Sequence, residues 1–161
     1  MPIGYADMRT GRRRRRKAGR IIGVLRPEPT TVKNAKPREA YEYLQSNPNA
    51  LLIDCRTEFE FYYVGHPVGA INVEWQTAPD FDRNPRFVEG VMKEAAGDRN
   101  RPVLLICRSG RRTLEAAAAL EGAGFTDVTN VLEGFEGDLD RSHHRSTVNG
   151  WRVAGLPWQQ L

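Results

Sequence analysis

The stretch RPVLLICRSGRRTLEAAAALEGAG, residues 101–124, decides the fold of this chain. Its first seven residues form a compact apolar run, which predicts a buried strand. Residues 111–124 combine an alanine run with glycines near the end, which predicts a helix. Cys107 therefore lies at the point where a strand gives way to a loop and then to a helix.

Outward from this stretch, strands and helices alternate. Thr57 and Glu60 have the spacing of a capping box and predict a short helix that Gly65 ends. The other predicted strands are residues 50–56, 69–74 and 127–134, and the other predicted helices are residues 36–49 and 85–97. Residues 75–84 are predicted as a loop. Residues 146–158 are predicted as a short helix leading to a tail. This order predicts an α/β fold, with a mostly parallel central sheet that carries helices on both faces. In such sheets the functional site lies beyond the carboxyl ends of the strands.

Length and charge divide the chain into two parts. The 161 residues suffice for one ordinary domain, and we assign it to residues 31–161. Residues 1–26 hold nine of the 24 Lys and Arg residues and one of the 20 acidic residues, so this segment carries a net charge of +8. The remainder of the chain is mildly acidic, so the positive net charge of the whole chain, +4, comes from this segment. We therefore treat residues 1–30 as a basic N-terminal extension and expect it to be disordered.

The basic extension allows three interpretations. It is a solvated segment without a function, it contacts RNA, DNA or an anionic lipid through residues 9–20, or it is a targeting segment. The apolar residues that follow the arginines are too few for a secretory signal, and no apolar run is long enough to span a membrane. The two cysteines, Cys55 and Cys107, form no disulfide framework, so we expect a reducing, cytoplasmic location.

The loop after Cys107 suits a reactive thiolate. The following helix directs its N-terminal N–H groups towards the loop, and Gly110 lets the main chain curl into an anion-binding nest. Arg108, Arg111 and Arg112 add positive charge. The same donors would bind an anionic substrate.

Two loop chemistries share this design. Cysteine-dependent phosphatases place an arginine six residues after the cysteine, whereas this chain has Thr113 there and Arg112 one position earlier. A loop shorter by one residue favours sulfur transfer, and a phosphatase or an arsenate reductase-like enzyme remains the less favoured enzyme hypothesis.

These motifs resemble those of the rhodanese-like domain family. The first is LLIDCRTEFEFYYVGHPVGAINV, residues 51–73, the second is CRSGRR, residues 107–112, and the closing segment contains VTNVLEGFEG and GLPW. The resemblance covers about residues 32–158, and its two main motifs agree in order and spacing. DRSHHRST, residues 140–147, departs from the family pattern as an insertion.

The resemblance implies a single-domain thiosulfate sulfurtransferase. Cys107 would be the nucleophile that becomes a persulfide, cradled by the amides of residues 108–112. Arg108 and Arg112 would hold the anionic donor, with Ser109, Gly110 and Arg111 completing the loop, and Asp54 and Arg56 would position it. The donor would be thiosulfate or a persulfide, the acceptor would be cyanide or a thiol, and neither a metal nor an organic cofactor would be needed.

Several alternatives stay open from the sequence alone. The protein is either an enzyme or a sulfur-carrying or sensing module that binds a protein or RNA partner. Cys55 is either a packed thiol or a resolving partner of Cys107. His66 is expected to fix a turn through a hydrogen bond, and Asp54 and Glu60 are expected to form a structural ion-pair set with Arg56.

Overall fold

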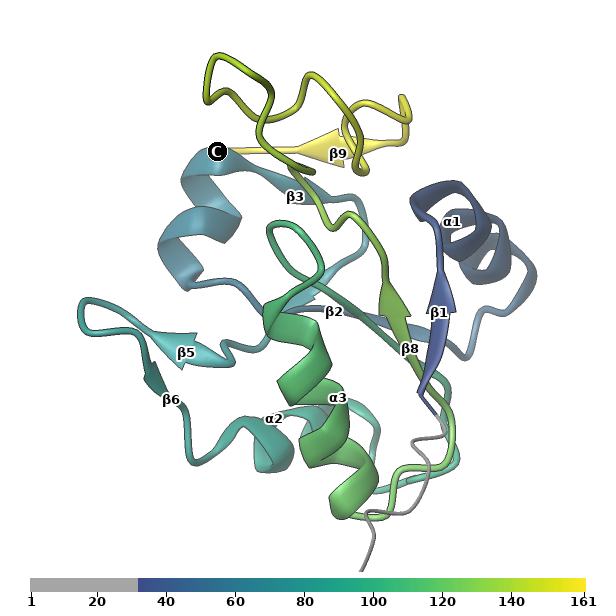
Figure 1. Ribbon diagram of the computed structural model, residues 1–161. Helices are drawn as coiled ribbons and strands as arrows, with labels where there is room; N and C mark the ends of the chain where they lie inside the picture. The colour runs from purple at the N-terminus through teal and green to yellow at the C-terminus, as the bar shows by residue number, and fades with distance from the viewer. Residues whose placement is uncertain (1–31) are drawn as a thin grey trace, which may run out of the picture.

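The computed structural model describes residues 32–161, and their centre is a five-stranded parallel sheet (Figure 1). The sheet has the strand order β1-β8-β7-β2-β4. Its strands are β1 (Lys33–Ala35), β2 (Leu51–Asp54), β4 (Ile71–Asn72), β7 (Val103–Ile106) and β8 (Val128–Val131). The predicted α/β class with a mostly parallel sheet is confirmed, although β1 was not predicted. The basic extension of residues 1–30, with its predicted disorder and its proposed contact segment 9–20, lies outside the described residues.

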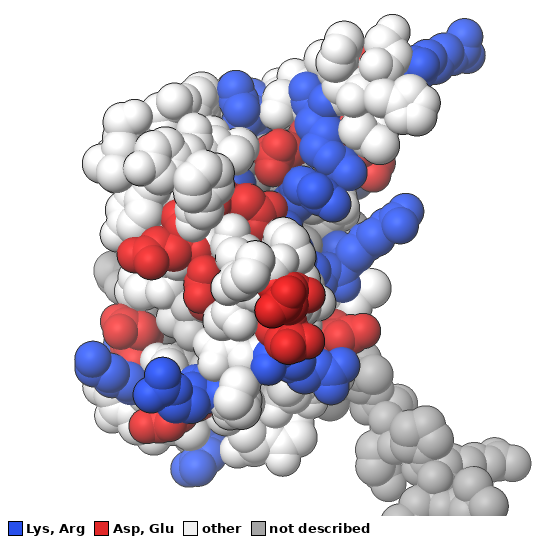
Figure 2. Space-filling model, turned by 90° about the vertical axis from the view of Figure 1, so that its left-hand side faces the viewer, with Lys and Arg blue, Asp and Glu red and all other residues white. Residues whose placement is uncertain are grey.

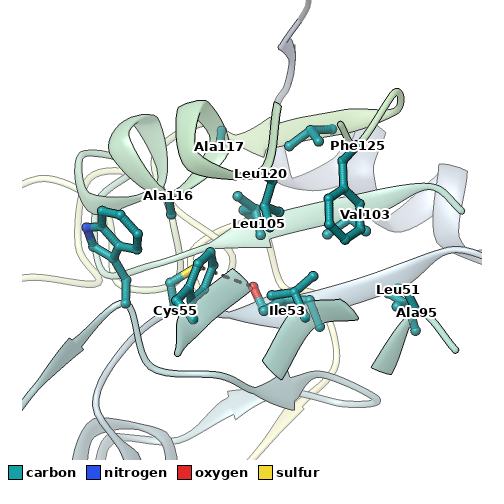
Figure 3. Packing of buried hydrophobic residues seen from close by; sticks show 14 of the residues in the cluster. Leu51, Ile53, Cys55, Ala95, Val103, Leu105, Ala116, Ala117, Leu120 and Phe125 are labelled. Carbon is teal, nitrogen blue, oxygen red and sulfur yellow. Dashed lines mark hydrogen bonds between the residues drawn. The ribbon is translucent and has the colours of Figure 1, made fainter. Parts of the chain in front are cut away.

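The central strands are buried on both faces, because helices cover each side of the sheet. All four residues of β2 and all four of β7 are buried. Successive side chains of a strand point to opposite faces, so Leu51, Ile53, Val103 and Leu105 pack on one side. There they meet α2 (Phe87–Glu94) and α3 (Arg112–Gly122), as Figure 3 shows for part of this cluster.

The opposite face of the sheet packs against α1 and the C-terminal segment. Helix α1 (Pro37–Ser46) begins with a proline at its first position, where a missing N–H costs nothing. Its Ala40 joins Leu104 and Ile106 in a second cluster, together with Phe135 and Trp151 from the segment that follows β8. The C-terminal segment thus lies over the same end of the sheet as Cys107, which directly follows β7.

The predicted capping box is present at the short helix after β2. The N–H of Thr57 donates to Glu60 at 3.0 Å, and the N–H of Glu60 donates to the Thr57 hydroxyl at 3.2 Å. The segment continues as a single π-helical stretch, η1 (Glu60–Val64), and Gly65 ends it with φ of +102°. Glycine suits this position because other residues rarely adopt such a φ.

Two predictions about irregular segments are wrong. Residues 75–84 are not only a loop, because β5 (Gln76–Thr77) and β6 (Asp82–Arg83) form an antiparallel hairpin. The predicted helix in residues 146–158 is a series of turns between Gly150 and Gly155, both with positive φ, which leaves too few residues for a helix. It leads into β9 (Trp158–Gln159), which pairs antiparallel with β3 (His66–Pro67).

Candidate active site

The thiol of Cys107 lies between the end of β7 and the first turn of α3. Its Sγ accepts a hydrogen bond from the N–H of Gly110 at 3.2 Å and lies 3.7 Å from the hydroxyl of Thr113. The residue is 1% exposed, so the loop covers the sulfur. The N–H of Gly110 therefore directs its partial positive charge at the sulfur, next to the first turn of α3.

Gly110 shapes the loop for two reasons. Its φ is +84°, and a Cβ at this position would lie 3.2 Å from the main-chain nitrogen of Glu133. Among residues 32–161, no main-chain carbonyl accepts a hydrogen bond from the N–H of Arg108, Ser109 or Arg111. Gly110 provides the one loop amide that bonds to the sulfur.

The segment after β8 fixes the loop from the other side. The N–H of Phe135 donates to the carbonyl oxygen of Cys107 at 2.7 Å, and the N–H of Glu136 donates to that of Arg108 at 3.0 Å. A Cβ on Gly134 would collide with the same carbonyl groups, and Gly134 has φ of +63°. Only glycine allows this close approach without a shift of the loop.

Arg112 points towards Glu60 and forms a bidentate ion pair with it. Its Nη1 and Nη2 donate to the two carboxylate oxygens at 2.8 Å and 2.7 Å, and both side chains are largely buried. Burial by itself raises the pKa of Glu60, but the hydrogen bonds and charge of Arg112, with the bonds from Thr57, outweigh it and lower this pKa to about 2. Arg112 is therefore held by a protein partner, and its expected role in binding the donor stays a prediction.

Asp54 and Arg56 form a buried ion pair beneath the site. Arg56 donates from Nη2 to Asp54 at 2.6 Å and to the carbonyl oxygen of Gly65 at 2.6 Å, and its guanidinium lies 4.4 Å from the centre of the Phe135 ring. Through Phe135 the pair supports the segment that binds the carbonyl of Cys107. The predicted set is thus corrected in one respect, since Glu60 pairs with Arg112 and not with Arg56.

Cys55 is a packed thiol next to the site. It directly follows Asp54, whose register partner is Ile106, so Cys55 and Cys107 follow neighbouring strands and belong to the same buried cluster. Its side chain is 0% exposed, and its Sγ lies 3.9 Å from the carbonyl oxygen of Ile53. Burial, and next the neighbouring Cys107, raise the pKa of Cys55 well above its ordinary value.

His66 has a structural position. Its ring stacks on Phe61 with 3.6 Å between the ring centres, and its Nδ1 lies 2.8 Å from the carbonyl oxygen of the same residue. Because a carbonyl only accepts, Nδ1 carries the hydrogen and Nε2 accepts from the side-chain amide of Gln159 at 3.2 Å. Both nitrogens are occupied, so the expectation that His66 holds the local chain in place is confirmed.

Two cavities flank the loop, and Arg108 lines both. One has a volume of about 530 Å³ and also contacts Glu60, Gln76, Phe81 and Arg112. The other has a volume of about 350 Å³ and lies against Arg108, Ser109, Arg111 and Arg145. Arg108 and Arg111 form no ion pair with any described residue. Figure 2 shows several Lys and Arg side chains along the upper right of one face, with Asp and Glu side chains beside them.

Three features of this site are not predicted from the sequence: the partner of Glu60, and the positions of Gly134 and Arg145. Glu60 is 52 positions from Arg112, and no local pattern links them. Gly134 and Arg145 lie beyond β8, in segments that the sequence marks only as a closing motif and an insertion. One signal was available for Glu60, because the carboxyl ends of parallel strands bring their following loops together.

The sequence of this chain is similar to those of known proteins that contain a rhodanese-like domain. The sequence model of the rhodanese-like domain matches residues 36–140. The chain is 32% identical to protein RC0915 of Rickettsia conorii over 80% of this chain and 98% of that protein, and 33% identical to the thiosulfate sulfurtransferase GlpE of Pseudomonas putida over 65% of this chain and 82% of that protein.

A solved crystal structure also has a fold similar to that of this chain. The crystal structure of Rv0390 from M. tuberculosis has a TM-score of 0.72 and 38% identity, and the match covers 82% of this chain and 100% of Rv0390. The family model matches most of the described residues, and the fold of Rv0390 matches this chain over the whole length of Rv0390. The chain therefore belongs to the rhodanese-like domain family.

Proposed function

We propose that this protein is a sulfurtransferase that carries one sulfur atom as a persulfide on Cys107. The observation that carries the proposal is the hydrogen bond from Gly110 to the Cys107 sulfur, within a loop whose remaining amides have no main-chain acceptor among the described residues. A relative in the same family is named thiosulfate sulfurtransferase, which supports this chemistry.

In the first step, the Cys107 thiolate attacks the outer sulfur of thiosulfate. A bond forms between the two sulfurs, the S–S bond of thiosulfate breaks, and its electron pair leaves with sulfite. The new negative charge lies on the outer sulfur, about 2 Å beyond Sγ. There the free amides of Arg108, Ser109 and Arg111 can stabilise it, as preorganised donors do for developing anions.

In the second step, an acceptor takes the outer sulfur. With a thiol, the acceptor sulfur bonds to the outer sulfur, the acceptor proton passes to the product persulfide, and the electron pair of the broken bond returns to Cys107 as a thiolate. The cycle needs no other reactant. Because the sulfur of Cys107 is covered by its loop, we expect the loop to shift as the donor enters.

Steady-state kinetics test the proposal. With thiosulfate as donor and cyanide as acceptor, we expect the parallel double-reciprocal lines of double displacement. Cys107→Ser should abolish turnover, whereas Cys55→Ser should retain it. Turnover by the Cys107→Ser variant would contradict the assignment. A protein that loads sulfur but passes it only to a protein partner would be a carrier and not a free-standing enzyme.

A further inference from the structure

The smaller cavity beside the Cys107 loop binds neither reactant in the two steps described above, although the N–H groups of three of its lining residues act in the first step. Its volume of about 350 Å³ falls in the range of sites for small organic molecules, about 300–1,000 Å³. The lining residues are Arg108, Ser109, Arg111, Asp138, Leu139 and Arg145. Three come from the active loop and three come from the segment after β8, so the cavity lies beside the loop that follows Cys107.

Arg145 reaches this cavity from the insertion, which is folded as a fixed turn. One carboxylate oxygen of Asp140 accepts the N–H groups of Ser142 and His144 at 2.8 Å and 2.9 Å, and the other accepts the hydroxyl of Thr147 at 2.9 Å. Arg145 donates from Nη1 to the carbonyl oxygen of Gly137 at 2.5 Å. Its guanidinium is thus held against the cavity wall while its other N–H groups remain for a ligand.

The two walls of the cavity are joined by main-chain hydrogen bonds. The N–H of Gly137 donates to the carbonyl oxygen of Arg108 at 3.2 Å, and the N–H of Ser146 donates to that of Glu136 at 2.7 Å. The active loop, the segment after β8 and the insertion therefore hold one another in place. A preformed cavity of this kind binds a ligand without the cost of ordering its walls.

The charge of the cavity selects an anion. Arg108, Arg111 and Arg145 form no ion pair with any of residues 32–161, and Asp138 is the one carboxylate in the lining. Asp138 already accepts a hydrogen bond from Asn149 at 2.9 Å. In the larger cavity, by contrast, Glu60 neutralises Arg112. Guanidinium groups bind carboxylates through paired hydrogen bonds, so the smaller cavity suits a carboxylate-bearing molecule.

We propose that this cavity binds the carboxylate groups of the sulfur acceptor, which is a small organic thiol bearing one or more carboxylates. The inference rests on the proposed function, since it names the molecule that takes the sulfur from Cys107. The carboxylates bind Arg145 and Arg111, and the thiol reaches across Arg108 to the outer sulfur. There the acceptor sulfur forms the new S–S bond, the Cys107 persulfide bond breaks, and the acceptor proton leaves on the product persulfide.

The test compares two acceptors of similar size in the presence of thiosulfate. Mercaptosuccinate carries two carboxylates, and thioglycerol carries none. In double displacement, kcat/KM for the acceptor reports the second step alone. We expect Arg145→Gln to lower kcat/KM for mercaptosuccinate about tenfold, the effect of one lost charged hydrogen bond, and to leave the values for thioglycerol and thiosulfate unchanged. Arg141→Gln is the matched control, because it removes the same charge from the same exposed insertion outside the cavity, and it should change none of them.

Two further measurements keep the outcomes distinct. Asp138→Asn removes the one carboxylate in the lining, so it should raise kcat/KM for mercaptosuccinate and leave the value for thioglycerol unchanged, which tests the cavity if Arg145→Gln perturbs the insertion. Methylthiosuccinate, which has no thiol, should bind the resting protein in calorimetry and bind Arg145→Gln more weakly. Equal losses for both acceptors, or a loss in kcat/KM for thiosulfate alone, would overturn the assignment of the cavity to the acceptor. Failure of the protein to load sulfur would instead contradict the proposed function, while the calorimetry would still test the cavity.

Discussion

The guanidinium of Arg112 and the carboxylate of Glu60 form two hydrogen bonds, at 2.8 Å and 2.7 Å, across the mouth of the Cys107 loop. This pair joins the first turn of α3 to the start of η1, and so to the capping box at Thr57. Arg112 and Arg108 therefore differ in their partners despite their proximity in sequence. Arg112 is paired with Glu60, whereas Arg108 lines both cavities and has no acidic partner among residues 32–161.

The Glu60–Arg112 pair predicts a pH-dependent contribution to stability. The pKa of Glu60 is about 2 in the folded protein and about 4.3 in an unfolded chain, so the pair stabilises the fold above about pH 4.3 and loses this effect as the pH falls through 2. The full contribution is up to about 3 kcal/mol. Urea unfolding between pH 7 and pH 2 should show Glu60→Gln less stable than the wild type at neutral pH, with the difference shrinking as the pH falls. A difference that does not depend on pH would contradict this role.

Gly134 predicts a coupling between the segment after β8 and the reactive loop. Gly134→Ala should slow sulfur uptake and destabilise the protein, because the new Cβ collides with the carbonyl groups of Cys107 and Arg108. Gly69→Ala is the control, since Gly69 also has a positive φ but its Cβ would meet no atom within 4 Å. Gly69→Ala should cost about 1–2 kcal/mol in urea unfolding and leave the uptake rate unchanged. Equal uptake rates for the two variants would show that the collision does not reach the loop.

The buried pair of Asp54 and Arg56 predicts a large loss of stability when one partner is removed. Arg56→Met leaves the carboxylate of Asp54 buried without its partner, so we expect a loss of about 3–5 kcal/mol in the free energy of unfolding. Lys33→Met removes one partner of an exposed pair, with Asp127 at 3.0 Å, and should cost no more than about 1 kcal/mol. Chemical denaturation of both variants measures the contrast, and a similar small loss for each would contradict the structural role of Arg56.

The two cysteines predict different reactivities in the native protein. Because burial raises the pKa of Cys55, its thiol stays protonated at neutral pH and should resist iodoacetamide until the protein unfolds. Cys107 is also covered, but by the loop that we expect to shift, so Cys107 should be the site of modification. Peptide mapping before and after denaturation distinguishes the two residues. Modification of Cys55 first would mean that the reactive thiol has been misassigned.

The parts of the fold that sequence predicts are those with a continuous local pattern. The runs that became β2 and β7 are apolar throughout because both faces of these strands are buried, and α3 has its alanine run. The hairpin of β5 and β6 escaped prediction because each strand has two residues, too few to show a period. The same holds for β9, which forms only because β3 lies opposite it.

At the candidate site, sequence predicts which residues lie in the loop but not what each side chain contacts. Cys107 and Gly110 could be chosen from the motif, since the chemistry needs a thiol and a residue with positive φ. The partner of Arg112 could not, because Arg56 and Arg112 are both arginines near acidic residues. Only the fold, which brings Glu60 within hydrogen-bond distance of Arg112, assigns one to the other. The contribution of Arg145 depends on how the insertion folds back, which its polar composition does not specify.

The most direct test of the central claim is the mass of the purified protein after brief incubation with thiosulfate, followed by peptide mapping without reducing agent. The account predicts a gain of one sulfur atom on Cys107, absent from Cys107→Ser, retained in Cys55→Ser and lost on addition of cyanide. An unchanged mass, or a sulfur found on Cys55, would contradict it.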